Sequence, residues 1–418
     1  MSINSFVYIL FCCWISICSI AYAEQKHIVD HVDEIIVDPQ LSLSDLVSQT
    51  LEKYPDYSLI AAMQKEANAL NQRGSHWFAG ASTASMYYKD DFVGTDTGAY
   101  EIEGAIEVPL WNWGQRDAGL QLAEQAGLSA ENKAKAINLQ VAGLVRGSLW
   151  NMELANIRHK MAEKNLYLTE KLLNTIQLRV KLGDLPKTDF LLAENEVLQK
   201  KIELVYAEAE LMHTRKRFTF LTQSNKIPQK INERQSGLEG IAESHPALAA
   251  VNANVAKQKA NVDWVKAEGS GQTTLALGGN MDKPSRIERT KDSLILSISI
   301  PFGGKDYAAP DIANAERQYT EAVIEKKQLY RQLLEQAHEA KHELEVERVQ
   351  LKIAIKMKQY AEQHSKMAKL SFEAGEINLM DFLRVQARSQ SADKQAEEST
   401  VRLQRDIALY NQAVGVTP

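Results

Sequence analysis

Cysteine is nearly absent from this chain of 418 residues, and its three copies all lie within the first 23 positions: Cys12, Cys13 and Cys18. The rest of the chain has no thiol, which excludes disulfide bonds and cysteine metal sites there. Residues 1–23 carry no charged side chain and end in Ala21-Tyr-Ala23, so they read as a signal peptide cleaved before Glu24. Export of the chain is therefore expected.

An excess of positive charge is also absent. The chain has 48 Lys and Arg against 54 Asp and Glu, a net charge of −6, which argues against a nucleic-acid partner. It contains no G-x-x-x-x-G-K-[ST] motif, which excludes an ATPase of the P-loop type. No stretch rich in Pro, Gly and Ser divides its middle, so a single body is expected.

What the chain does have is an internal repeat with a spacing of about 192 residues. Gly183 to Leu191 is echoed by Gly375 to Leu383, and both segments end in Asp-Phe-Leu. Val108-Pro-Leu is echoed by Ile300-Pro-Phe, and Tyr54-Pro by His245-Pro. A unit of this length indicates a duplicated half of a domain.

Apolar spacing, turn residues and proline positions predict the same order of elements twice. After a tether at 24–43, the first repeat (44–222) is predicted to contain a helix over 45–73 with Ser44 as N-cap, a β-hairpin over 77–109, a long helix over 114–182 and a return helix over 189–221. After a polar connector at 223–243, the second repeat (244–414) is predicted to contain a helix over 246–268, a hairpin over 271–301, a long helix over 310–373 and a return helix over 379–414, with a tail at 415–418. The fold class is mainly α with a small β part.

The predicted strands alternate apolar and polar residues. Leu294–Ile300 places Leu and Ile opposite Ile295 and two serines, and Glu101, Glu103 and Glu107 alternate with apolar neighbours. Such a sheet suits either a soluble protein with one wet face or a membrane whose lipid meets the apolar side while the glutamates line a lumen. Export, nearby aromatic residues and strand length favour the membrane. Four strands cannot close a barrel, so copies must associate, and three would supply twelve strands.

The order of these elements, with the segments Arg179–Ala193 and Leu370–Leu383, resembles the TolC-type outer membrane efflux protein family over nearly the whole mature chain. The resemblance implies a homotrimer, with a twelve-stranded barrel in outer membrane lipid and a helical tunnel across the periplasm. It implies that the hairpin tips meet a periplasmic adaptor and, through it, an inner-membrane efflux pump. It implies no cofactor and no catalytic group.

The resemblance also implies roles for residues near the two helical turns. The tip positions that would contact the adaptor are Arg179, Gly183, Gly375 and Glu376. The positions at the periplasmic entrance are Asp189, Phe372, Ile377, Asp381 and Arg384. Phe372 and Ile377 stand where some family members close the entrance with a tyrosine and an arginine, so that polar closure is not expected here. The simpler alternative is that both aspartates cap the return helices.

One motif imitates a zinc protease. His338, Glu339 and His342 match H-E-x-x-H, and Glu362 follows at a plausible distance. On one unbroken helix, however, His342 and Glu362 would lie about 30 Å apart and could not share a metal. No metal site is predicted there, and His27 and His31 are expected to be solvated in the tether.

The sequence therefore predicts an outer membrane channel of an efflux system, not an enzyme, with metal cations or drugs as cargo and a secreted protein as a further possibility. The alternative from another class is an exported, soluble coiled-coil scaffold.

Overall fold

The computed structural model describes residues 34–303 and 305–418, so the predicted signal peptide, His27 and His31 lie outside the described residues. Two units divide the chain: residues 155–216 form one, and residues 35–154 with 217–418 form the other. Helices make up most of both repeats, and strands form a smaller part. No helix among the described residues combines the length and hydropathy that a bilayer crossing requires.

The first predicted helix is wrong in extent, because the chain forms two helices where one was expected over 45–73. Helix α1 spans Leu43–Lys53 and α2 spans Tyr57–Ser75. Tyr54 precedes a proline and adopts an extended conformation, which ends α1. The predicted cap at Ser44 is also wrong: Ser42 is the N-cap and forms a capping box with Asp45.

The predicted tether and connector contain strands that the sequence analysis missed. Strand β1 (Ile36–Asp38) pairs in parallel with β4 (Lys226–Pro228), and Lys226 reaches the Asp38 carboxylate at 3.3 Å. The two strands join the tether that precedes the first repeat to the connector that follows it.

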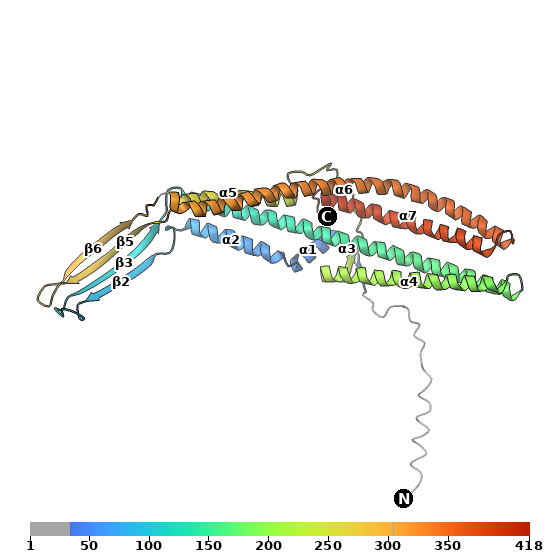
Figure 1. The fold of residues 1–418 in the computed structure, drawn as a ribbon, viewed down its shortest axis with the longest axis horizontal. Coiled ribbons are helices and arrows are strands. Elements are labelled where there is room, and N and C mark those ends of the chain that lie inside the picture. The colour runs from blue at the N-terminus through green and yellow to red at the C-terminus, as the bar shows by residue number, and fades with distance from the viewer. Residues whose placement is uncertain (1–33, 304) are drawn as a thin grey trace, which may run out of the picture. The chain divides into compact units, whose positions relative to one another are not determined.

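The main sheet has four antiparallel strands in the order β2-β3-β5-β6. Its members are β2 (Thr83–Asp90), β3 (Tyr100–Leu110), β5 (Thr273–Lys283) and β6 (Lys291–Ser299). One strand pair comes from each repeat, and β3 and β5 join the pairs (Figure 1). Every strand connects to a helix at the same end of the sheet, which leaves the two hairpin loops at the other end.

The remaining helices are long. They are α3 (Gln115–Lys181), α4 (Lys187–Thr222), α5 (Pro246–Glu268), α6 (Lys305–Glu373) and α7 (Leu379–Ala413). Helix α6 begins five residues before the predicted start at 310, so Pro310 lies inside it and removes one backbone hydrogen bond from the second turn. Helices of 67 and 69 residues measure about 100 Å at 1.5 Å per residue, far more than a globular core requires.

Each unit packs its helices through narrow apolar stripes. In residues 155–216, the ends of α3 and α4 bury Ile176, Ala193 and Val197. In the larger unit, Leu344 of α6 packs with Tyr410 and Val414 at the end of α7. Small residues such as alanine dominate the buried positions, which lets neighbouring helices approach closely. Most apolar positions outside these stripes stay exposed.

A buried polar network fixes the C-terminal end to α3. Arg146 has no exposed surface, and its guanidinium donates to both carboxylate oxygens of Glu233, at 2.8 and 2.6 Å. The same guanidinium donates to Gln412 Oε1 at 2.7 Å and to the Val416 carbonyl at 2.9 Å. Asn411 donates to Glu233 as well, at 3.2 Å. The connector, α7 and the tail are thus held by one side chain of α3.

We expect Arg146→Ala to lower the free energy of unfolding by about 3–5 kcal/mol, because it leaves the Glu233 carboxylate without its buried partner. Lys135→Ala is the matched control. It removes an exposed ion pair to Glu131 on the same helix, at 2.7 Å, and should cost less than about 1 kcal/mol. Unfolding followed by helical circular dichroism distinguishes the two. Equal effects of both substitutions would contradict a structural role for the Arg146 network.

Candidate functional site

The cross-strand register divides the main sheet into two chemically different faces. Glu101, Glu103 and Glu107 of β3 stand in register with Lys89, Tyr87 and Thr83 of β2. On β5 and β6 the same face carries Ala276, Asn280, Asp282, Lys291, Ser293 and Ser297. The three glutamates therefore share one polar face.

The opposite face of the sheet is apolar and uncovered. It carries Met86, Ile106, Leu277, Leu294, Leu296 and Ile298, whose exposed fractions run from 54% to 81%. A contiguous apolar surface of this kind on a soluble monomer marks a site of protein or membrane contact. The outer edges of β2 and β6 also have no strand beside them within the described chain.

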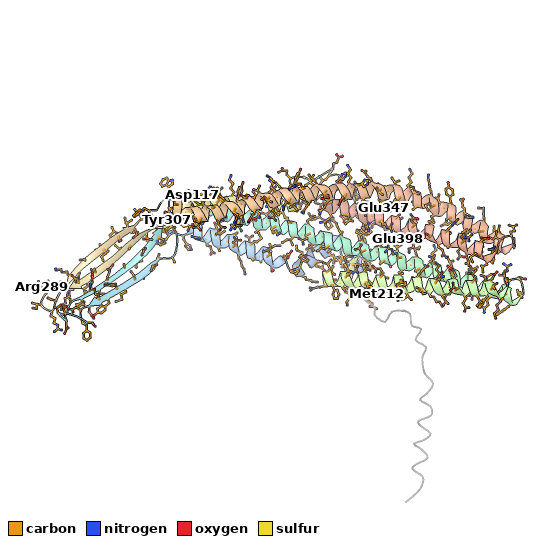
Figure 2. All side chains as sticks on the ribbon, viewed as in Figure 1. Asp117, Met212, Arg289, Tyr307, Glu347 and Glu398 are labelled. Carbon is orange, nitrogen blue, oxygen red and sulfur yellow. The ribbon has the colours of Figure 1, made fainter. Side chains whose placement is uncertain are left out.

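Aromatic residues border the sheet at both ends. At the end where the helices begin lie Trp77, Trp113, Phe302 and Tyr307, which are 76% to 100% exposed, and Figure 2 shows Tyr307 there. Toward the loop end lie Tyr88 and Tyr100. Strands of 8 to 11 residues between two aromatic borders match the height of a transmembrane β-barrel wall.

The two hairpin loops are fastened to each other. Arg286 of the β5–β6 loop forms an ion pair with Asp96 of the β2–β3 loop at 2.7 Å, and its N–H donates to the Thr97 carbonyl. Asp91 organises the β2–β3 loop: hydrogen bonds from the Thr97 hydroxyl and from the backbone N–H groups of Thr97 and Ala99 lower the pKa of Asp91 to about 2. Figure 2 places Arg289 at this end of the sheet.

Both helical hairpins turn through the same backbone motif. Gly183 and Gly375 have φ of +83° and +77°, the left-handed region that favours glycine. In each turn the glycine N–H and the next N–H bond back to carbonyls of the preceding helix, as in a Schellman motif. The repeat seen in the sequence is therefore a repeat of turn geometry.

At the second turn, the alternative that Asp381 caps the return helix is wrong. Asn378 is the N-cap of α7, and its side-chain oxygen accepts from the Asp381 N–H at 2.8 Å. The Asp381 carboxylate stays half exposed and pairs with Arg384 at 3.3 Å. Its side chain is thus available to solvent rather than consumed as a cap.

Phe372 does not project from this turn. It is buried and stacks on Phe382 of α7, with ring centroids 5.2 Å apart and planes within 8°. Ile377 is half-buried, and Glu376 accepts from Ser371 Oγ at 2.9 Å. Within the chain, therefore, Phe372 stabilises the hairpin end, and Asp381 with Arg384 forms the polar surface.

The first turn belongs to the smaller unit. Asp189 lies in the first turn of α4 and is half-buried, and its N–H donates to the Pro186 carbonyl. The carbonyl of Arg179 accepts the Asp184 N–H in the turn at Gly183. Asp189 and Asp381 fall in different units, so each turn is a candidate site on its own.

The H-E-x-x-H segment has no third metal ligand nearby among the described residues. His338, Glu339 and His342 are exposed on α6, and Glu362 lies on the same helix about 30 Å further along. Across residues 34–303 and 305–418, no group of three His, Asp or Glu side chains is placed to hold a metal ion.

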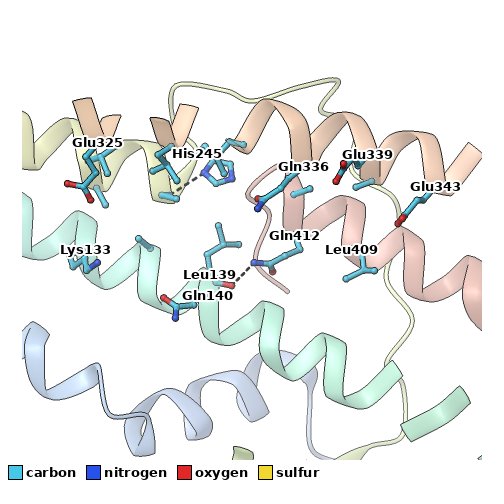
Figure 3. A pocket seen from close by; sticks show the side chains of 18 residues that line it. Lys133, Leu139, Gln140, His245, Glu325, Gln336, Glu339, Glu343, Leu409 and Gln412 are labelled. Atoms are coloured by element: carbon cyan, nitrogen blue, oxygen red, sulfur yellow. Dashed lines mark hydrogen bonds between the residues drawn. The ribbon is translucent and has the colours of Figure 1, made fainter. Parts of the chain in front are cut away.

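A cavity of about 590 Å³ lies where α7 ends and α5 begins, and it was missed in the sequence (Figure 3). Its walls come from α3, α5, α6 and α7, including Lys133, Glu325, Glu339, Glu343 and His245. His245 caps α5, and its Nδ1 accepts the Ala247 N–H at 3.2 Å. Burial lowers the pKa of His245, so it is neutral near pH 7 and packs against Gly415.

No protein-family model and no curated protein sequence matches the chain. Solved structures do match, and their fold is that of the TolC-type outer membrane channels, so the resemblance read from the sequence is confirmed at the level of the fold.

Three of these structures show how extensive the match is. CusC, studied for its folding and transmembrane channel formation, is 14% identical with a TM-score of 0.74, over 93% of this chain and 95% of its own. The CmeC outer membrane channel of Campylobacter jejuni is 14% identical with a TM-score of 0.70, over 89% and 85%. The outer membrane protein VceC of Vibrio cholerae is 15% identical with a TM-score of 0.72, over 90% and 97%.

We expect Gly375→Ala to destabilise the second helical turn by about 1 kcal/mol, because alanine is strained at positive φ. Gly127→Ala is the matched control: Gly127 lies inside α3, and nothing stands within 4 Å of an added Cβ. There the same substitution should stabilise the helix by roughly 0.5–1 kcal/mol. Opposite shifts of the unfolding midpoint support the turn geometry, and two shifts of the same sign would contradict it.

Proposed function

We propose that the protein is an outer membrane channel, the exit duct of an efflux system. One observation carries the proposal: a four-stranded sheet with one apolar, uncovered face, one polar face and two open edges. Lipid suits the first face and water the second. Hydrocarbon cannot satisfy the unpaired backbone groups of the edges, so other copies of the chain must pair with them.

Three copies would supply twelve strands, an even number within the range of outer membrane barrels. The helices favour the same association. Apolar side chains along α6 are exposed in the single chain, among them Ile324, Val349, Ile353, Tyr360, Met367 and Leu370. In the smaller unit the exposed set includes Tyr167, Leu178, Leu191, Leu198, Ile202 and Tyr206. Helical hairpins set side by side in a ring would cover these side chains.

In this proposal the polar face with Glu101, Glu103 and Glu107 lines the lumen, and the helical hairpins extend into the periplasm. Their turns would meet a periplasmic adaptor and, through it, an inner-membrane pump. Arg179, Gly183, Gly375 and Glu376 are the proposed contact positions. The structures named above are of outer membrane channels and proteins that share this fold, which supports the location and the role.

The proposed periplasmic entrance lies near Asp381 and Asp189. Three copies of Asp381 would place three carboxylates around one constriction, which attracts cations, but each carboxylate pairs with Arg384 of its own chain at 3.3 Å, which offsets this charge. Phe372 and Ile377 stand where some family members close the entrance with a tyrosine and an arginine, so that polar closure is not proposed here; Phe372 is buried in its own hairpin and Ile377 is half-buried. Arg384, which pairs with Asp381, is the polar side chain proposed to take part in closing the entrance.

The cargo proposed is cationic, either metal ions or drugs, because the charges expected on the path are mainly carboxylates. A secreted protein is the remaining cargo. The second candidate function, an exported soluble scaffold, would leave the apolar face of the sheet in water or under a partner protein.

The proposal predicts that the protein is extracted from the envelope only by detergent, because lipid covers the apolar face of its sheet. It also predicts a heat-resistant trimer, because the strand edges of the three copies are paired with one another. Loss of the gene should raise susceptibility to metal cations or drugs. A monomer released by salt buffer would establish the scaffold instead. Unchanged susceptibility together with a secretion defect would reassign the cargo to protein.

A further inference from the structure

The charges on the polar face of the sheet are unevenly arranged along the strands. The charged members of this face are Lys89, Glu101, Glu103, Glu107, Asp282 and Lys291. Four of the six fall in one row at the loop end of the sheet. The other two, Glu103 and Glu107, lie in separate rows closer to the helices.

The row at the loop end is electrically balanced. Lys89 stands in register with Glu101, Glu101 with Asp282, and Asp282 with Lys291. Side chains in register on neighbouring strands lie within about 4.5–5.5 Å at Cβ, so two cations and two carboxylates share one narrow band. Glu101 also accepts a hydrogen bond from Asn280 Nδ2 at 2.9 Å. This row has no net charge.

Glu103 and Glu107 have no such compensation. Glu103 stands between Tyr87 and Asn280, and Glu107 stands between Thr83 and Ala276. Neither carboxylate forms an ion pair with any side chain in the described parts of the chain. Lys89, the nearest cation in the ladder, is directly opposite Glu101 and only diagonal to Glu103.

We infer that Glu103 and Glu107, and not Glu101, determine the charge selectivity of the barrel segment. The inference rests on the proposed channel, because it requires the polar face to line an aqueous lumen. In a trimer these residues form two rings of carboxylates, and the Lys89 row forms a neutral ring nearer the loops. Uncompensated charge on a low-dielectric wall raises the local concentration of counter-ions. The proposed channel therefore favours cationic solutes, and the carboxylates of the neutral ring add little to this selectivity.

The test is the reversal potential of purified protein in planar bilayers under a potassium chloride gradient. It reports the permeability ratio of K⁺ to Cl⁻ whatever fraction of channels is open. In Glu103→Gln/Glu107→Gln the ratio should fall severalfold, toward one, and the selectivity that remains should become less sensitive to salt concentration. The variant should still run as a heat-resistant trimer, because both side chains are solvated.

The matched control is Lys89→Gln/Glu101→Gln, which also removes two charged side chains per chain, one ammonium and one carboxylate, and leaves its row neutral. Its permeability ratio should equal that of the unmodified protein. If the permeability ratio is unchanged in Glu103→Gln/Glu107→Gln, or falls equally in the control, the inference is wrong and the proposed channel is unaffected. Purified protein that stays monomeric and does not insert into the bilayer contradicts the channel itself and the inference with it.

Discussion

The unpaired edges and the apolar face of the four-stranded sheet determine what surroundings this protein requires. Among the residues that the structure describes, β2 and β6 end the sheet without a neighbouring strand, and one face of the sheet presents apolar side chains such as Leu294 and Leu296. Unpaired backbone groups need partners, and a large apolar surface needs a non-aqueous environment. A single chain in water satisfies neither requirement. A closed barrel in lipid, built from several copies, satisfies both and places the polar face around water.

The helical part follows from the same arrangement. All four strands connect to helices at one end of the sheet, so in the proposed barrel the helices lie on one side of the membrane only. Two helices of nearly seventy residues each begin a helical hairpin, and each hairpin reverses at a glycine in a Schellman turn. The duplicated sequence thus encodes duplicated geometry. Residues that differ between the two repeats, such as the Asp381–Arg384 pair, are expected to give each helical turn its own function.

Local signals predicted much of the fold. Proline-free stretches of helix-favouring residues predicted α3 and α4. The glycine before each Asp-Phe-Leu segment predicted both helical turns. The alternation of apolar and polar residues predicted the two faces of the sheet that the strand register shows. Contacts between distant residues could not be predicted. Arg146 and Glu233 are 87 positions apart, and Asp96 and Arg286 are 190 apart. The strands β1 and β4, of three residues each, carry no periodicity, and the helix break at Tyr54 was missed although Pro55 marked it.

The most direct test labels two adjacent residues of β6. Residues 24–418 contain no cysteine, so Leu296→Cys and Ser297→Cys each accept a single nitroxide label. In reconstituted bilayers the label at 296 should be relaxed mainly by oxygen, which partitions into lipid, and the label at 297 mainly by a water-soluble nickel complex. Labels at both positions reached equally by the nickel complex, or shielded from both reagents, would contradict a sheet with lipid on one face and water on the other.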